Sequence, residues 1–273
     1  MFYNIFFAFF GVLFGKLGSE VVNLWQQTSN ALLSCRESAT FEWLFFNNYS
    51  TMVKRVTFYI DGFNFYFGLK RSRKADNAWA ACYWIDMVKL CESFLGPDQV
   101  LEKVIYFTAS PLSPQKNSRQ SAFLNANRLL NGNRFEIVRG KYMEKHYECP
   151  YCKGNISRPE EKKTDVNISV RMIEDCVCSK TDVVSLVSAD TDLIPPLDMI
   201  RRNFPSIKLK VYFPPSSSSL DIKDNLLRHH SKPVHMHKNL RRFQQAVMPD
   251  DVSVGSLTYT IPAKWKAWQS PNC

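Results

Sequence analysis

From Arg55 onward, hydrophobic and polar positions form blocks whose period switches between that of a strand and that of a helix. Short β-branched and aromatic runs predict strands, and the longer segments between them predict helices. Strands are expected at 56–60, 104–109, 135–138, 182–188 and 207–213, and helices at 79–94, 115–130, from 164, at 193–203 and at 220–227. This alternation predicts an α/β protein in which a parallel sheet is covered by helices on both faces.

Other segments lack a regular period. Residues 140–159 are expected to form a polar loop, and the chain after 227 is basic and loop-rich. The helix that begins near Thr164 carries Val166, Val170, Ile173 and Val177 on one apolar stripe, and Thr164 suits its N-cap.

The first 51 residues differ from the rest. Residues 2–14 are almost entirely apolar, but a membrane-spanning helix needs about 20 such residues, and Lys16 and Glu20 interrupt any extension. Met52 opens a segment that resembles a natural start of translation. We therefore interpret residues 1–51 as an apolar N-terminal extension from a mis-annotated start and expect no membrane association. A peripheral membrane anchor is the alternative.

The charge balance points to polyanionic partners. The chain has 35 Lys and Arg against 25 Asp and Glu, a net charge of +10. An excess of this size favours nucleic acid or an anionic membrane surface, although a basic protein without such a partner is also compatible with it. The 8 cysteines are scattered rather than arranged in a dense framework, so we expect a reducing, cytoplasmic location.

Four aspartates are expected at one edge of the sheet. Asp61 follows the first strand, Asp190 and Asp192 follow the fourth, and Asp165 lies in the first turn of the intervening helix. Taken singly, each is explained as a turn or helix-start residue. Together they would repel one another unless a cation offset the charge. Mg²⁺ or Mn²⁺ suits such a set of oxygen ligands. Asp182 belongs at the opposite edge, where we expect a structural role.

Three segments resemble the motifs of the NYN domain family, in the PIN-like nuclease superfamily and its bacterial branch. They are 59–64 (YIDGFN), 160–167 (EEKKTDVN) and 187–193 (VSADTDL), and the resemblance extends over about residues 54–265. It implies a Rossmann-like PIN fold and metal-dependent endoribonuclease activity on RNA. It also implies a catalytic domain at 52–215 with a cysteine-containing insertion at 140–159, followed by a basic extension at 216–273.

The resemblance also implies roles for single residues. The acidic metal-binding and catalytic positions are matched by Asp61, Asp165, Asp190 and Asp192. Substrate-side positions are matched by Asn64, Lys162 and Ser188, and Ala189 stands where glycine is more usual. RNA is the expected partner, no small-molecule organic cofactor is expected, and the oligomeric state stays open.

Other residues suggest chemistry less strongly. Cys149 and Cys152 have the spacing of a redox or zinc motif, but a closed zinc site needs four ligands, so we favour a cysteine-tipped loop over bound Zn²⁺. The histidines between 229 and 237 lie among arginines and lysines, which favours a solvated basic surface. Tyr66 and Phe67 could stack on bases, but core packing is the preferred interpretation.

Two functions from other classes stay open. A nucleic-acid-binding or regulatory protein with a vestigial pocket would keep the basic surface without catalysis. A glycosyltransferase could use an Asp-x-Asp pair to hold a metal and a sugar nucleotide, but that interpretation leaves Asp61 and Asp165 unexplained.

Overall fold

The computed structural model describes residues 53–148, 150–152 and 154–269. The chain divides into two units, Met1–Met52 and Val53–Cys273. The interpretation of residues 1–51 therefore lies outside the described residues. Within the described part, no helix is both long enough and apolar enough to span a bilayer.

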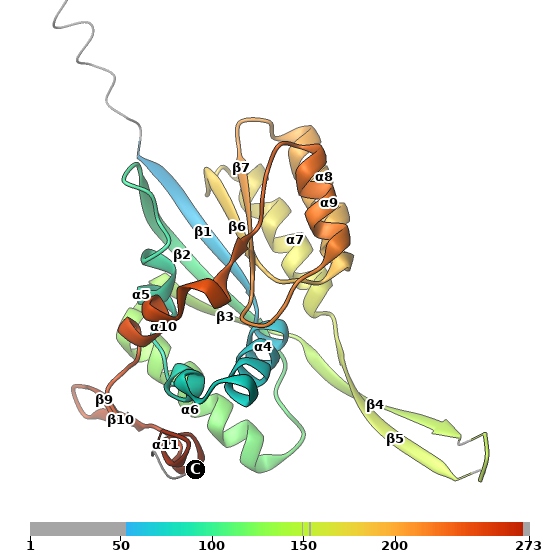
Figure 1. Ribbon diagram of the computed structural model, residues 1–273, viewed down its shortest axis with the longest axis vertical. Helices are drawn as coiled ribbons and strands as arrows, with labels where there is room; N and C mark the ends of the chain where they lie inside the picture. The colour runs from blue at the N-terminus through green and yellow to red at the C-terminus, as the bar shows by residue number, and fades with distance from the viewer. Residues whose placement is uncertain (1–52, 149, 153, 270–273) are drawn as a thin grey trace, which may run out of the picture. The chain divides into compact units, whose positions relative to one another are not determined.

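A six-stranded parallel sheet forms the centre of the second unit, in the order β3-β2-β1-β6-β7-β8 (Figure 1). The strands are β1 (Lys54–Asp61), β2 (Gln99–Thr108), β3 (Phe135–Arg139), β6 (Val183–Val187), β7 (Lys208–Phe213) and β8 (Val234–His235). The order runs outward from β1 in both directions, as in doubly wound folds. Such sheets bind ligands beyond the carboxyl ends of the strands where the order reverses, which here is between β1 and β6.

Helices cover both faces, as the alternation of strands and helices predicts (Figure 1). One face carries α4 (Gly62–Ala75), the 3₁₀ helix η2 (Asn77–Tyr83), α5 (Met87–Glu92) and α6 (Pro114–Asn131). The other carries α7 (Thr164–Val177), α8 (Ile194–Asn203) and α9 (Leu220–Arg228). Successive residues of β1 alternate between the two cores: Phe58 and Ile60 belong to one, and Tyr59 belongs to the other.

The helix expected at 79–94 is two shorter helices, η2 and α5. The chain is extended between them, where Ile85 forms a β-bridge with Val247. Asp86 then caps α5 by accepting hydrogen bonds from the backbone N–H groups of Val88 and Lys89, at 2.9 and 3.1 Å. The apolar run continues through the break because both helices pack on the same core, so hydrophobic period alone does not reveal the interruption.

The loop expected at 140–159 is instead an antiparallel hairpin, β4 (Lys141–Glu148) and β5 (Asn155–Lys162). Its polar sequence lacks the apolar alternation that identifies a half-buried strand. The hairpin is held by backbone pairing between its two strands, which runs from the pair Lys141 and Lys162 to the pair Glu148 and Asn155.

The basic segment after residue 227 contains more structure than its sequence predicts. It holds β8, η5 (Met236–Asn239), α10 (Leu240–Gln245), the hairpin of β9 (Asp251–Val254) and β10 (Leu257–Thr260), and α11 (Ala263–Ala267). Met236, Phe243 and Trp265 are buried in the same core as α4 and α6. These elements are too short to give a periodic signal, but they complete that face of the sheet.

Helix α7 packs through a face that its apolar stripe does not predict. Of the predicted stripe, Ile173 packs against the core but Val166, Val170 and Val177 are exposed. The residues buried against the sheet are Ile168 and Met172. The buried face of α7 also includes polar positions, and these need partners that lie far away in the sequence.

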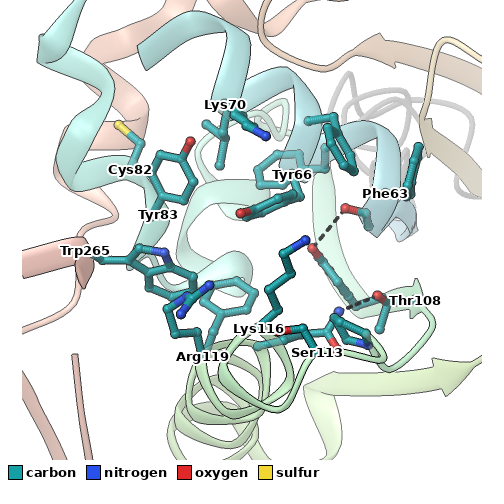
Figure 2. A pocket seen from close by; sticks show the side chains of 18 of the residues that line it. Phe63, Tyr66, Lys70, Cys82, Tyr83, Thr108, Ser113, Lys116, Arg119 and Trp265 are labelled. Atoms are coloured by element: carbon teal, nitrogen blue, oxygen red, sulfur yellow. Dashed lines mark hydrogen bonds between the residues drawn. The ribbon is translucent and has the colours of Figure 1, made fainter. Parts of the chain in front are cut away.

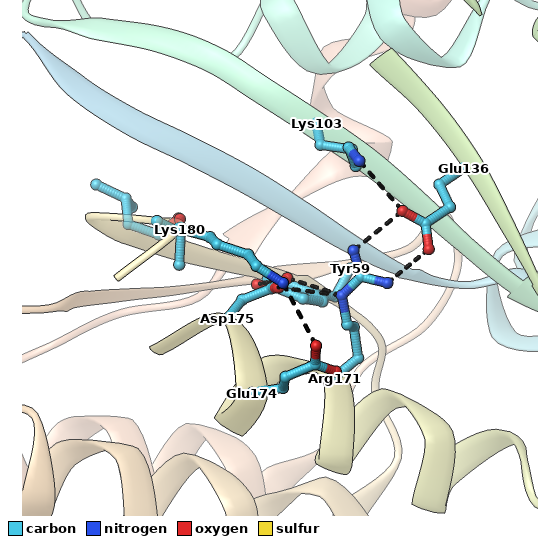
Figure 3. Close-up of polar contacts among 9 residues, drawn as sticks. Tyr59, Lys103, Glu136, Arg171, Glu174, Asp175 and Lys180 are labelled. Carbon is cyan, nitrogen blue, oxygen red and sulfur yellow. Dashed lines mark hydrogen bonds and ion pairs between the residues drawn. The ribbon is translucent and has the colours of Figure 1, made fainter. Parts of the chain in front are cut away.

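Those partners form a network of charged groups around Arg171, shown in Figure 3. Its guanidinium donates to both oxygens of Glu136 on β3 and, through Nε, to Asp175 at 3.1 Å. Asp175 is buried and also accepts a 2.9 Å hydrogen bond from Tyr59 on β1. The hydrogen bond from Arg171 lowers the pKa of Glu136, and burial raises the pKa of Tyr59. The network therefore ties α7 to β1 and β3.

We expect Arg171→Gln to lower the free energy of unfolding by about 3 kcal/mol at pH 7, because it removes the closer charged partner of the buried Asp175 and leaves the exposed Lys180 at 3.7 Å as its remaining cation. Part of this deficit should disappear on acidification. The pKa of Glu136 is lower in the folded protein, so its contribution exists above its ordinary pKa and is lost as the pH falls through the folded value. Urea unfolding at several pH values measures both effects. Lys180→Gln, which removes an exposed cation of the same network, is the control and should change little. An equally small change in Arg171→Gln would contradict the anchoring role.

Candidate metal centre

Asp61 ends β1 and forms the N-cap of α4, so one residue links the strand edge to the start of a helix. Its side chain is 2% exposed and accepts hydrogen bonds from Asn64 N (3.0 Å), Asn64 Nδ2 (2.6 Å) and Ser188 Oγ (2.8 Å). Gly62 permits the tight passage from strand to helix, since a Cβ there would lie 2.5 Å from a ring carbon of Tyr106. The position and orientation of this carboxylate are therefore closely fixed.

The surroundings of Asp61 oppose its ionisation. Burial raises the pKa of Asp61, and the nearby charge of Asp190 raises it further, while the hydrogen bonds from Asn64 and Ser188 act in the opposite direction. A cation beside the carboxylate would favour the ionised form.

Asp165 and Asp190 reach the same place from two other elements. Asp165 lies in the first turn of α7. The residue before this helix, Lys163, has a left-handed backbone conformation (φ 73°). Asp190 follows β6, and its backbone N–H donates to Ser188 Oγ at 3.1 Å. One carboxylate oxygen from each of Asp61, Asp165 and Asp190 lies within 4.8 Å of the other two. The three aspartates expected from three separate segments are thus brought together at the carboxyl edge.

This set of donors fits a divalent cation. Mg²⁺ binds oxygen at about 2.1 Å in octahedral geometry, so two of its ligand oxygens are about 3.0 Å apart when adjacent and about 4.2 Å apart when opposite. The carboxylate oxygens lie within 4.8 Å of one another, so side-chain rotations that draw them closer would place all three on one ion. Mg²⁺ commonly keeps several waters, and Mn²⁺ accepts the same oxygen ligands. Asp61, Asp165 and Asp190 could therefore hold either ion.

The fourth predicted aspartate lies outside this group. Asp192 is exposed, and its backbone N–H donates to Asp190 Oδ1 at 3.1 Å, which begins the 3₁₀ helix η4 (Thr191–Leu193). A contact of Asp192 with the metal through water stays a prediction.

Two residues expected on the substrate side contact Asp61, and a contact of either one with substrate stays a prediction. Ser188 is fully buried and bridges Asp61 to the backbone of Asp190. The backbone N–H and the side-chain amide of Asn64 both donate to Asp61. Both orient the carboxylate. Lys162 ends β5, and its side chain is not described.

The cysteine pair is only partly described. Cys149 lies outside the described residues, and Cys152 is an exposed free cysteine. A zinc site at this pair stays untested.

A cavity of about 360 Å³ adjoins the metal centre, and its position was not predicted (Figure 2). Its wall includes Gly62, the residue after Asp61, together with Tyr66 and Phe67 of α4. The sequence assigned both rings to the core; Tyr66 does pack against it, but both rings are partly exposed and line the cavity. In the sequence, the run of aromatic residues directly after the first strand is the feature that could have indicated this cavity.

Comparisons with known proteins place these features in context. The model of the NYN domain matches residues 55–226. The chain is 26% identical over 207 residues to 6-hydroxy-3-succinoylpyridine 3-monooxygenase HspA of Pseudomonas putida, and the match covers 64% of each chain. A crystal structure of a protein of unknown function from Vibrio parahaemolyticus matches with a TM-score of 0.44 and 17% identity, over 68% of this chain and 95% of that one. At this level the structural match supports no conclusion about function.

We expect Ser188→Ala to weaken Mn²⁺ binding most at acidic pH. Loss of the hydroxyl removes a hydrogen bond that lowers the pKa of Asp61, so Asp61 holds its proton to higher pH and the ion must displace it. The Mn²⁺-induced rise in melting temperature, measured across pH, should begin at higher pH in the variant. The control is Ser185→Ala, which removes a buried hydroxyl from β6, the strand that precedes Ser188. Identical pH profiles for Ser188→Ala and wild type would contradict this role for Ser188.

Proposed function

Because this chain belongs to the NYN domain family, we propose that it is a metal-dependent endoribonuclease that hydrolyses RNA phosphodiester bonds. The NYN domain suggests a nuclease-type hydrolase. The observation that carries the proposal is the convergence of Asp61, Asp165 and Asp190 within 4.8 Å at the switch point of the sheet. A site of this kind suits phosphoryl chemistry, because a bound divalent cation neutralises phosphate charge and lowers the pKa of a water.

The residues of the chain have separate tasks in this proposal. Asp61, Asp165 and Asp190 hold Mg²⁺ or Mn²⁺, and Asn64 and Ser188 orient Asp61 and favour its ionised form through their hydrogen bonds. Asp192, exposed beside Asp190, can hold or orient water in the outer part of the site. The net charge of +10 attracts the RNA backbone.

A second candidate function follows from the named relative, which is a monooxygenase of a substituted pyridine. The aromatic-walled cavity favours it, since a cavity of about 360 Å³ admits a single small ring system. It leaves the carboxylate cluster without a role. Oxidation of NADH or NADPH by O₂ that depends on 6-hydroxy-3-succinoylpyridine, without RNA cleavage, would support this candidate over the nuclease.

A third candidate is a nucleic-acid-binding protein without catalysis. RNA binding that persists while no cleavage occurs with Mn²⁺ or Mg²⁺ would favour it over the nuclease. The same assay with EDTA separates cleavage that depends on the metal from contaminating activity.

We expect Asp190→Asn to reduce Mn²⁺-dependent cleavage of single-stranded RNA by roughly 100-fold or more, because it removes one charged oxygen ligand. Folding should be preserved, since asparagine caps a helix start about as well as aspartate does. EDTA should abolish the wild-type activity.

The matched control is Asp182→Asn, which removes a carboxylate at the opposite edge of the sheet. Asp182 pairs there with Arg55 at 3.0 Å, as the sequence predicts for a structural residue, so cleavage should continue. Undiminished cleavage by Asp190→Asn would contradict the proposed function.

A further inference from the structure

The cavity beside the metal centre lies between the helices that follow β1 and β2. Figure 2 shows Phe63 and Tyr66 of α4 on one wall, with Lys116 and Arg119 extending from α6 on the other. Gly62 and Thr108, at the carboxyl ends of β1 and β2, both line it. The cavity therefore opens at the edge of the sheet that carries Asp61.

Aromatic rings make up much of the cavity wall. Phe63 stacks at a tilt on Phe67, with ring centroids 4.4 Å apart, and Tyr66 meets Tyr83 edge to face at 5.8 Å. Phe63 is 45% exposed, so its ring is available to a ligand. Such a wall suits a flat ring, which gains stacking energy against aromatic side chains.

The charged groups around the cavity are all cations. Within the part of the chain that the structure describes, no carboxylate forms a salt bridge with Lys70, Lys116 or Arg119. Cations without an acidic partner beside a cavity are suited to an anionic group on its ligand.

Two polar atoms in the wall point to a ring that contains heteroatoms. Trp265 is 5% exposed, and its Nε1 donor is buried without a hydrogen-bond partner among the described residues. Gln120 donates through Nε2 to Thr108 Oγ1 (2.8 Å) and to the carbonyl oxygen of Ala109 (3.2 Å). Its buried Oε1 is an acceptor without a hydrogen-bond partner among the described residues. A hydrocarbon ring would leave both atoms unsatisfied, at a cost in free energy. A nucleobase offers both donors and acceptors at its edge.

From these features we propose that the cavity holds one unstacked nucleobase of single-stranded RNA, while Lys116 and Arg119 contact its phosphate. RNA as the source of the nucleotide rests on the proposed function. The volume of about 360 Å³ suits one nucleotide unit. Bases within a duplex are stacked and cannot enter, so the cavity selects unpaired segments and places the adjoining phosphodiester near Asp61.

The test measures RNA binding separately from cleavage. Fluorescence anisotropy in EDTA compares a short labelled single-stranded RNA with an abasic strand that has the same phosphates. The wild type should bind the RNA about tenfold more tightly than the abasic strand. Phe63→Ala should lose most of this difference and bind the abasic strand as the wild type does. Arg119→Gln should weaken RNA binding more than Arg128→Gln, which removes an exposed charge elsewhere on α6.

Each outcome bears on the proposal. Equal affinity of the wild type for both strands, or an unchanged preference in Phe63→Ala, overturns it. Competition by adenosine monophosphate supports the nucleotide chemistry, whereas competition by nicotinate without any by the nucleotide identifies a small-molecule site and overturns the RNA assignment. Base-dependent binding without cleavage in Mn²⁺ supports the base site while the proposed nuclease function fails.

Discussion

The buried carboxylate of Asp61 is the constraint on which the site depends. It sits at the end of the central strand, 2% exposed, under three hydrogen bonds from Asn64 and Ser188. Its pKa is nevertheless raised by burial, and among the described residues neither Asp61 nor Asp190 forms a salt bridge with lysine or arginine. The hydrogen bonds thus orient a carboxylate whose negative charge no lysine or arginine of the described residues neutralises. A divalent cation bound there would neutralise it.

The remaining oxygens depend on distant packing. Asp165 is placed by α7, and α7 is held against β1 and β3 by the contacts of Arg171 and Asp175 with Tyr59 and Glu136. A displacement of α7 would move Asp165 relative to Asp61 and Asp190, so this network at the far end of the helix is coupled to the geometry of the metal centre. Asp190 needs no such support, because Ser188 binds its backbone directly.

The sequence predicted the parallel sheet and its helices because β-branched runs and turn residues are local signals. It also predicted that four aspartates meet at one edge, since residues after parallel strands share an edge, and three of them, Asp61, Asp165 and Asp190, lie together. It did not predict the buried face of α7, which depends on Asp175 pairing with Tyr59 and Arg171 pairing with Glu136, both far away in the sequence. Nor did it predict the hairpin at 141–162. The positioning roles of Asn64 and Ser188, and the cavity lined by Tyr66, emerge only once side chains from separate elements are placed together.

The central claim is that Asp61, Asp165 and Asp190 bind one divalent ion centre. Anomalous diffraction from crystals of the protein grown with Mn²⁺ tests it most directly. The account predicts an anomalous peak within about 2.3 Å of a carboxylate oxygen of each of these residues. Crystals with Mn²⁺ at other positions and no peak among these three carboxylates would contradict it.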